Sequence, residues 1–454
     1  MPQRVLGMSL FALFACLLSS PSAATPLRLH GSNTIGERLA LRLSQAWLQQ
    51  NGYQRLGVDD LAYDELQVYG HSAEGERRVE IKAHGSSTAF RGLLNGSADI
   101  GMASRPVKPS EREQAMPVLG DLAGPDGEIV LALDGLAIIV NQRNPLTSIS
   151  VAQLREVFSG RTRDWRELGG KPDRIALHAR DERSGTWDSF NGTVLNGQPL
   201  SQGAKRYEST TELAAAVASD VNAIGFVGLS GVDGVKALAV SDGGKPVRPD
   251  MFEVAVEDYP LSRRLFLYLP ANASAEARDF VRFALSDAGQ QVVEETGFVS
   301  QRVQAFDPVL RDDLPEEYRG LIQDAQRLSF NFRFDAGSAL LDNKGLRDFE
   351  RLVSYANGPQ TEGRRLMLMG FSDATEGVPL MAWRLSNDRV DYIAALLARK
   401  RVAVHRARGF GGEAPVASND SDRGRSRNRR VEVWLGPPAT AGRLSNSGGA
   451  LSRP

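Results

Sequence analysis

The hydrophobic and polar positions of the N-terminal half repeat one arrangement three times. A short apolar strand leads into a turn of small or hydroxyl residues and then into an amphipathic helix. The turns are Gly31–Thr34, Gly85–Thr88 and Arg180–Thr186. After each turn, apolar residues recur every three or four positions, which is the period of a helix with one buried face. This alternation of strands and helices predicts an α/β fold. The face predicted for the first helix consists of Ile35, Leu39, Leu43 and Trp47.

The chemistry of these turns suits an anion. The first N–H groups of a helix are unpaired and carry a partial positive charge, and an open α/β sheet aims such helix ends at one edge. Hydroxyl groups and the side chain of Arg180 would add hydrogen bonds to an oxyanion. A single turn of this kind is more often an ordinary helix cap. Three of them in one chain predict an oxyanion-binding cleft.

The C-terminal part follows a different pattern. Residues 328–334 alternate between apolar and polar positions, as a half-buried strand does, and helical faces and further strands follow. The resulting βαβαββ order predicts a small α+β domain, separate from the first. Its expected elements are strands at 328–334 and 365–371, helices at 346–356 and 385–399, and strands at 402–408 and 430–435.

Composition and the N-terminus predict an exported protein. The 454 residues suffice for two or three domains, and a net charge of −1 disfavours a protein that coats nucleic acid. Residues 1–24 have the basic start, short apolar core and small-residue end of a signal peptide. That apolar run is too short for an ordinary transmembrane helix, so no transmembrane span is predicted. The only cysteine, Cys16, lies in this segment, and lipidation there is the less favoured alternative to soluble secretion.

Catalysis has little support in the sequence. A nucleophilic serine needs a base within hydrogen-bond reach. The chain has five histidines, and three of them, His30, His84 and His178, fall in or beside predicted strands. The spacings typical of metal ligands are absent. The sequence therefore predicts no catalytic residue, no metal site and no cofactor.

Several motifs of the N-terminal part occur together in one known family. They are Gly31–Thr34, Gly85–Thr88, Ala98–Pro106, Asp134–Asn141, Val157–Gly160 with Trp165, Arg180–Thr186 and Asp258–Ser262. Through them, residues 26–305 resemble the periplasmic phosphate-binding proteins of ABC importers. The resemblance implies a two-lobed, type II Venus-flytrap domain over residues 25–310, with lobes at 26–130 plus 255–310 and at 140–245. The ligand contacts that it implies are Thr34, Ser86, Ser87, Arg180, Ser184, Gly185 and Thr186.

Arg105 departs from the pattern of that family. It stands where many relatives have an aspartate, which accepts a hydrogen bond from protonated phosphate. An arginine attracts oxyanions that an aspartate would repel, so Arg105 is included among the predicted contacts. An exposed surface cation is the alternative interpretation. The choice among phosphate, sulfate, arsenate and an organic anion stays open.

A second set of motifs covers the C-terminal part. It comprises Phe332–Asp335, Gly370–Asp373, Leu385–Arg389, Gly409–Val416 and Asn428–Glu432. Through them, residues 326–436 resemble an OmpA-like peptidoglycan-binding domain. The resemblance implies that Asp373 and Arg389 clasp the diaminopimelate of the stem peptide, with Ser372 as a further contact. An anion and a cation suit the ammonium and carboxylate of a free amino-acid end.

Two departures from the OmpA-like pattern predict a weakened contact with the stem peptide. The interval from Asp373 to Arg389 is one residue longer than usual, and the loop 374–379 can absorb the extra residue. Ala382 replaces a common asparagine, which removes one contact.

The remaining segments carry little chemistry. Residues 311–325 are acidic and proline-broken, which predicts a linker, and residues 437–454 have the composition of a disordered tail. The basic run 423–430 has too few aromatic neighbours for a nucleic-acid platform, so it is expected to be a solvated loop.

Together these features predict a non-enzymatic solute-binding protein in the periplasm or at the outer membrane of a Gram-negative bacterium. It would capture an inorganic oxyanion, phosphate above others, and be anchored to peptidoglycan. An ABC permease is a further candidate partner, although a carrier held at the wall would reach it poorly, so sensing and scavenging are alternatives. The rival hypotheses are a structural or adhesive envelope protein with a vestigial anion site and a phosphate-ester hydrolase.

Overall fold

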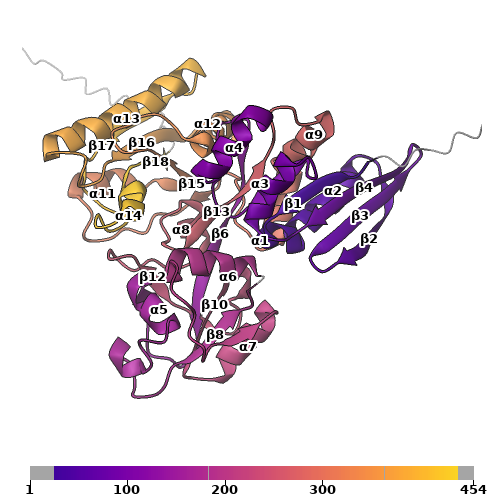
Figure 1. Cartoon of the computed structure of the whole chain (residues 1–454). Helices are drawn as coiled ribbons and strands as arrows, with labels where there is room; N and C mark the ends of the chain where they lie inside the picture. Colours follow the sequence, from indigo (N-terminus) through magenta and orange to yellow (C-terminus); the bar gives the residue numbers. More distant parts are fainter. Residues whose placement is uncertain (1–24, 183, 362, 438–454) are drawn as a thin grey trace, which may run out of the picture.

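The computed structural model describes residues 25–182, 184–361 and 363–437 (Figure 1). The predicted signal peptide, Cys16 and nearly all of the predicted tail lie outside the described residues. The N-terminal domain has two lobes, one in indigo and purple and one in magenta, and the orange and yellow C-terminal domain packs beside them. The predicted combination of a two-lobed α/β domain and a small α+β domain is confirmed.

One strand, β6 (Glu128–Val140), joins the two lobes. Its first part pairs with β13 (Ser262–Tyr268) and its last part pairs with β10 (Ala223–Gly228). The change of partner occurs next to Gly135, and this junction of the two lobes is called the hinge below. The other strands of this sheet are β2 (Gln54–Ala62), β3 (Glu65–Ser72), β4 (Gly75–Lys82), β1 (Leu27–Gly31), β5 (Ile100–Ala103), β8 (Ala176–Arg180), β9 (Lys205–Tyr207) and β11 (Lys236–Ala237).

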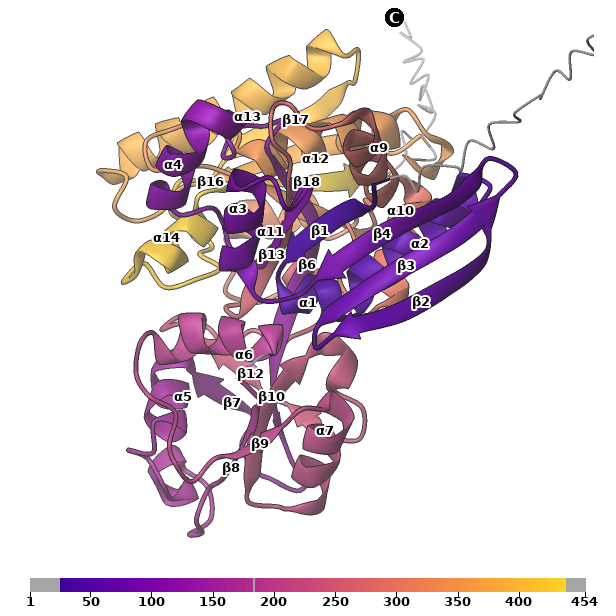
Figure 2. The same cartoon turned by 45° about the vertical axis from the view of Figure 1, so that its right-hand side comes forward.

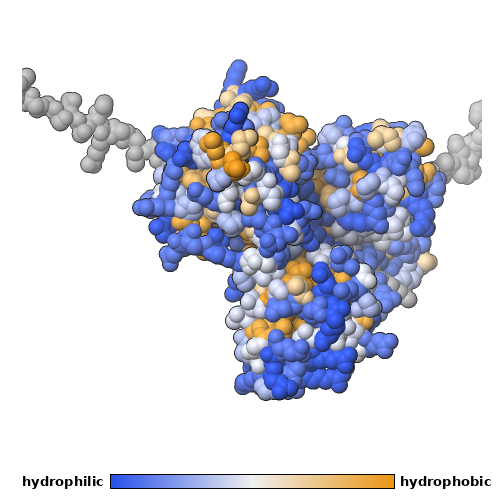
Figure 3. Space-filling model, turned by 60° about the vertical axis from the view of Figure 1, so that its left-hand side comes forward, coloured by the Kyte–Doolittle hydropathy of each residue, from blue (hydrophilic) through white to orange (hydrophobic). Residues whose placement is uncertain are grey.

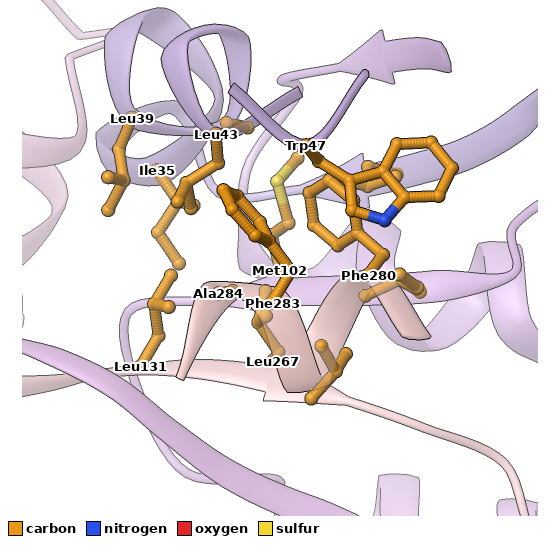
Figure 4. Close-up of a cluster of buried hydrophobic side chains, with 14 of the residues drawn as sticks. Ile35, Leu39, Leu43, Trp47, Met102, Leu131, Leu267, Phe280, Phe283 and Ala284 are labelled. Carbon is orange, nitrogen blue, oxygen red and sulfur yellow. The ribbon is translucent and has the colours of Figure 1, made fainter. Parts of the chain in front are cut away.

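The predicted apolar face of the first helical segment is buried against the sheet of the first lobe. Its residues lie in one cluster with Met102 and Phe280, and the Trp47 and Phe280 rings meet edge to face at 5.6 Å (Figure 4). The helices of this domain are α1 (Asn33–Ile35), α2 (Leu41–Gln50), α3 (Ser86–Leu94), α4 (Pro109–Leu119), α5 (Val151–Phe158), α6 (Gly185–Phe190), α7 (Thr210–Ser219), α8 (Met251–Ala255), α9 (Ala275–Ala284) and α10 (Asp287–Glu295).

The C-terminal domain is a five-stranded sheet with helices, and its strands occur in the order β14-β15-β18-β16-β17. Its elements are β14 (Ala305–Phe306), α11 (Glu316–Ile322), β15 (Gln326–Arg333), α12 (Asn343–Ala356), β16 (Arg365–Phe371), α13 (Pro379–Arg399), β17 (Val404–Gly409), α14 (Asp422–Asn428) and β18 (Arg430–Gly436). The segment expected to be a linker contains α11, whose Tyr318 packs edge to face on Phe371 and Phe410. This segment therefore contributes to the core of the domain.

Three expectations for this domain are wrong. Strand β15 is buried on both faces and is not half-buried. Helix α13 begins at Pro379 rather than near Leu385, because proline is well suited to the first turn of a helix. The basic run at 423–430 is not a solvated loop, because most of it forms α14. The side chains of Arg427 and Arg430 are buried there and pair with acidic residues.

The C-terminal domain contacts both lobes. On the first lobe, Arg264 Nη1 lies 2.6 Å from Asp342 Oδ2 at the start of α12, while its Nε bonds Glu257. On the second lobe, Arg427 of α14 forms an ion pair with Asp242. The two domains are therefore joined by specific polar contacts on both sides of the hinge.

The surface agrees with a protein whose apolar residues are mostly internal. The face in Figure 3 is largely hydrophilic, with small groups of apolar atoms. Across residues 25–437, apart from positions 183 and 362, none of the helices combines the length and apolar character needed to cross a bilayer.

Candidate functional site

A cavity of about 880 Å³ lies where the turns of the two lobes meet. The first lobe contributes Asn33 at the start of α1 and Ser86 at the start of α3. It also contributes Asp64 from the turn between β2 and β3, two strands seen side by side in Figure 2. Asp64 accepts a hydrogen bond from Asn33. The second lobe contributes Asp188 of α6 and the residues that follow that helix. The cavity therefore lies between the lobes and next to helix N-termini.

The structure brings the three predicted turns together. A Cβ atom built on Gly185 would lie 1.7 Å from Thr34 Oγ1, so only glycine permits this approach of the lobes. Ser86 and Ser87 line the cavity, and Ser86 Oγ accepts a 3.0 Å hydrogen bond from Ser104 N–H. Thr34 and Gly185 lie at the lobe-to-lobe contact instead of on the cavity wall.

Arg180 and Ser184 are buried, and both already have partners in their own lobe. The guanidinium of Arg180 bonds the Thr210 hydroxyl and, at 2.8 Å, the Glu208 carbonyl. Its Nε–H is buried without a hydrogen-bond partner in the described part of the chain, but Arg180 is not among the residues that line the cavity. Ser184 Oγ accepts a hydrogen bond from Thr186 N–H and so caps α6.

Arg105 lines the cavity, but its charge is already compensated. Both terminal nitrogens bond the Glu111 carboxylate, at 2.8 and 2.7 Å, and the guanidinium lies 5.2 Å from the Phe90 ring centre. Burial alone would raise the pKa of Glu111. The hydrogen bonds from Arg105 and Lys108 outweigh burial and hold the pKa below its usual value, so this carboxyl stays ionised. Arg105 is therefore neither an exposed cation nor an uncompensated one.

Arg263 of β13 is the residue at this site that the sequence analysis missed. It forms an ion pair with Asp134, in which Nη2 and Nε both donate to Asp134 Oδ2, at 2.7 and 3.0 Å. Its other hydrogen bonds go to the Gly185 carbonyl of one lobe, at 2.8 Å, and to Thr34 Oγ1 of the other, at 3.1 Å. The sequence did hold a sign of such a residue. Asp134 lies inside a long apolar strand, and a buried acid there requires a buried cation.

The cavity wall is electrostatically mixed. Its charged residues are Arg105, Lys108 and Arg263 against Asp64, Glu182 and Asp188. Burial raises the pKa of Asp188, and Arg263 and Arg105 oppose that rise. Protonation of Asp188 would make the wall more favourable to an anion.

A second cavity of about 760 Å³ adjoins the first and separates the first lobe from the C-terminal domain. The two cavities share Ser104, Arg105, Thr193 and Arg263. Several arginines line the second cavity. Among them, Arg264 and Arg333 have acidic partners at 2.6 Å.

In the C-terminal domain, the predicted wall-binding residues are fully buried, and each has its own partner. Asp373 pairs with Arg429 at 2.6 Å, and Arg389 pairs with Glu376 at 2.6 Å. Ser372 Oγ donates to the Ala382 carbonyl at 3.1 Å. The charges of Asp373 and Arg389, which were expected to bind the stem peptide, are therefore both paired with residues of the same chain.

The described residues contain no group of three or more histidine, cysteine, aspartate or glutamate side chains arranged to hold a metal ion.

Comparison with known families divides the chain into the same two parts. Residues 57–288 match a PBP superfamily domain, and residues 333–429 match the OmpA family.

Individual relatives match the N-terminal part. Protein SphX of Synechococcus elongatus is 32% identical over 246 residues, which cover 50% of this chain and 70% of SphX. The phosphate-binding protein PstS of Staphylococcus aureus is 27% identical over 248 residues, 52% of this chain and 74% of PstS. An ABC-type phosphate transport receptor of Vibrio cholerae aligns at 25% identity over 60% of this chain and 99% of that receptor, with a TM-score of 0.48.

Proposed function

The chain belongs to the PBP superfamily, and on that basis we propose that it captures an inorganic oxyanion, most readily phosphate, between its two lobes. The C-terminal OmpA-family domain attaches the protein to peptidoglycan through the diaminopimelate of the stem peptide. The protein works in the periplasm, at the cell wall.

The observation that carries this proposal is the meeting of three donor-rich turns from two lobes beside one cavity. Ser86 and Ser87 supply hydroxyl groups on the cavity wall. Thr34, Ser184, Gly185 and Thr186 belong to the adjoining turns and are the further donors of the proposal. Arg180 adds a buried charge with one N–H that has no partner among the described residues. Buried donors without partners cost free energy, and an anion that accepts from them recovers it. The charge of Arg105 is already engaged, so this residue shapes the wall more than it binds the guest.

Closure of the lobes follows from this geometry. An anion that contacts both lobes binds the closed form better than the open form and shifts the population toward closure. Attachment to the wall limits travel to an ABC permease, so local capture or sensing fits the architecture better than long-range delivery.

Replacing Arg180 with alanine is expected to weaken phosphate binding by about 10- to 100-fold, because a charged hydrogen bond in a buried site is lost. Calorimetric titration of the full chain with phosphate, and separately with sulfate, measures this effect. The control is Arg91→Ala, an exposed arginine on α3, which should bind like the wild type. Absence of heat from the wild type with both anions would favour a structural envelope protein with a vestigial site.

Replacing Asp373 with asparagine is expected to reduce retention on purified peptidoglycan sacculi by about tenfold, because an ammonium group loses its anionic partner. The full chain is sedimented with sacculi, and the bound fraction is measured. Asp388→Asn, an exposed acid on α13, is the control and should leave the bound fraction unchanged. Equal retention of all three proteins would contradict the proposed role of Asp373.

A further inference from the structure

The loop between β16 and α13 places a carboxylate on the cation of the proposed wall-binding site. Glu376 accepts hydrogen bonds from Arg389 Nη2 at 2.6 Å and Arg389 Nη1 at 2.8 Å. Two backbone groups complete the set, Gly337 N–H at 2.9 Å and Asp373 N–H at 3.2 Å. The carboxylate is thus held by four donors, and its side chain is 4% exposed.

These four donors form a built pocket for a carboxylate. A guanidinium fork matches the two oxygens of a carboxylate, and backbone N–H groups add direction. Arg389 is held in place from behind, because its nitrogens also donate to the carbonyls of Ser338 and Phe371. The pocket is therefore preorganised, and the group that fills it belongs to the chain.

The loop residues next to Glu376 are exposed, so the carboxylate can leave with little other loss. Ala374, Thr375, Gly377 and Val378 are exposed on either side of the buried Glu376 side chain. Gly377 has a φ of +109°, a value that glycine adopts readily. Release of Glu376 into water would cost mainly its four hydrogen bonds, and an incoming carboxylate would restore them.

We propose that Glu376 is an internal competitor for the carboxylate pocket of the C-terminal domain, and that the free carboxylate of a stem peptide must displace it. This inference rests on the proposed wall-binding function. A tethered group competes at a high effective concentration. The apparent affinity of the pocket for a stem peptide is its intrinsic affinity multiplied by the fraction of molecules in which the pocket is open. Displacement of Glu376 thus sets the strength of wall attachment.

Substitution of Glu376 in the full chain tests the proposal, with a diaminopimelate-containing stem tripeptide as the calorimetric probe. Glu376→Gln removes the competing charge, and deletion of Glu376 also shortens the loop. If Glu376 fills the pocket in at least nine-tenths of the wild-type molecules, both variants bind the tripeptide at least about tenfold more tightly than the wild type. Adding Arg389→Ala to Glu376→Gln abolishes the gain. Glu413→Gln, an exposed acid of the same domain, leaves the affinity unchanged.

The outcomes separate this inference from the function on which it rests. A wild type that binds as tightly as Glu376→Gln and the deletion variant overturns the internal competitor and leaves wall binding intact. No binding by the wild type or by either folded variant overturns the wall-binding function, and the inference falls with it. Thermal unfolding of each variant shows whether it is folded, and the deletion variant decides the question if Glu376→Gln does not fold.

Discussion

Replacing Arg263 with alanine is expected to lower the free energy of unfolding by about 3–5 kcal/mol, because Asp134 would keep a buried charge without its partner. The Asp134 side chain is 4% exposed and lies in β6, the strand common to both lobes. The same change removes the hydrogen bonds that Arg263 makes to Thr34 and Gly185. We therefore expect weaker anion binding as well as lower stability. Urea unfolding of the full chain, followed by circular dichroism, measures the first effect.

Two further variants isolate the cause. Arg91→Ala, an exposed arginine in the same lobe, should change the free energy of unfolding by no more than about 0.5 kcal/mol. Arg263→Met combined with Asp134→Leu removes both charges and should regain most of the lost stability, since apolar pairs often replace buried ion pairs without penalty. Anion binding by this double variant should remain weak. A loss below 1 kcal/mol in Arg263→Ala would show that the ion pair does not hold the hinge.

Acidification is expected to destabilise the protein steeply between about pH 4.5 and pH 2. Burial alone would raise the pKa of Glu257 and Glu432, but the charge of Arg264 beside the first and of Arg327 beside the second outweighs it. The pKa of each carboxyl is thereby held at about 2. A folded-state pKa below the unfolded value of 4.5 gives stability that is complete above pH 4.5 and is lost as pH falls through 2. Each group contributes about 3 kcal/mol.

Glu253 of α8 should act in the opposite direction. Burial, together with the charges of Asp258 and Asp250, raises its pKa to about 8. Its contribution to stability is therefore complete below pH 4.5 and is lost as pH rises toward 8. Urea unfolding from pH 2 to pH 8 should give a maximum near pH 4.5 to 5. Glu253→Gln should flatten the alkaline side alone, and an unfolding free energy that does not change with pH would contradict both assignments.

The sequence was informative where structure depends on local spacing. The apolar face from Ile35 to Trp47 follows the period of a helix, and its members are buried together. The alternation in 328–334 follows the period of a strand, and β15 covers nearly the same residues. The meeting of Thr34 with Gly185 does not follow from local patterns, because β1 and β8 run in opposite directions in the two lobes and the turns after them face each other.

The missed features depend on pairs that are distant in the chain. Arg263 and Asp134 are separated by 129 positions, and no local period connects them. The basic run around Arg427 resembles a solvated loop until Asp242, 185 positions away, supplies its counter-charge. Glu376 was not singled out from the sequence, and its contact with Arg389 required the fold. Long-range charge pairing is thus the part of this protein that the sequence alone leaves open.

The contacts of the C-terminal domain on both sides of the hinge have a mechanical consequence. Asp342 of the C-terminal domain pairs with Arg264 of one lobe, and Arg427 of the same domain pairs with Asp242 of the other. The C-terminal domain therefore bridges the hinge. Any lobe rotation that lengthens one of these contacts makes cleft opening and domain docking parts of a single equilibrium. If the two domains bind anion and wall as proposed, the factor by which wall binding changes the anion affinity equals the factor by which the anion changes wall binding.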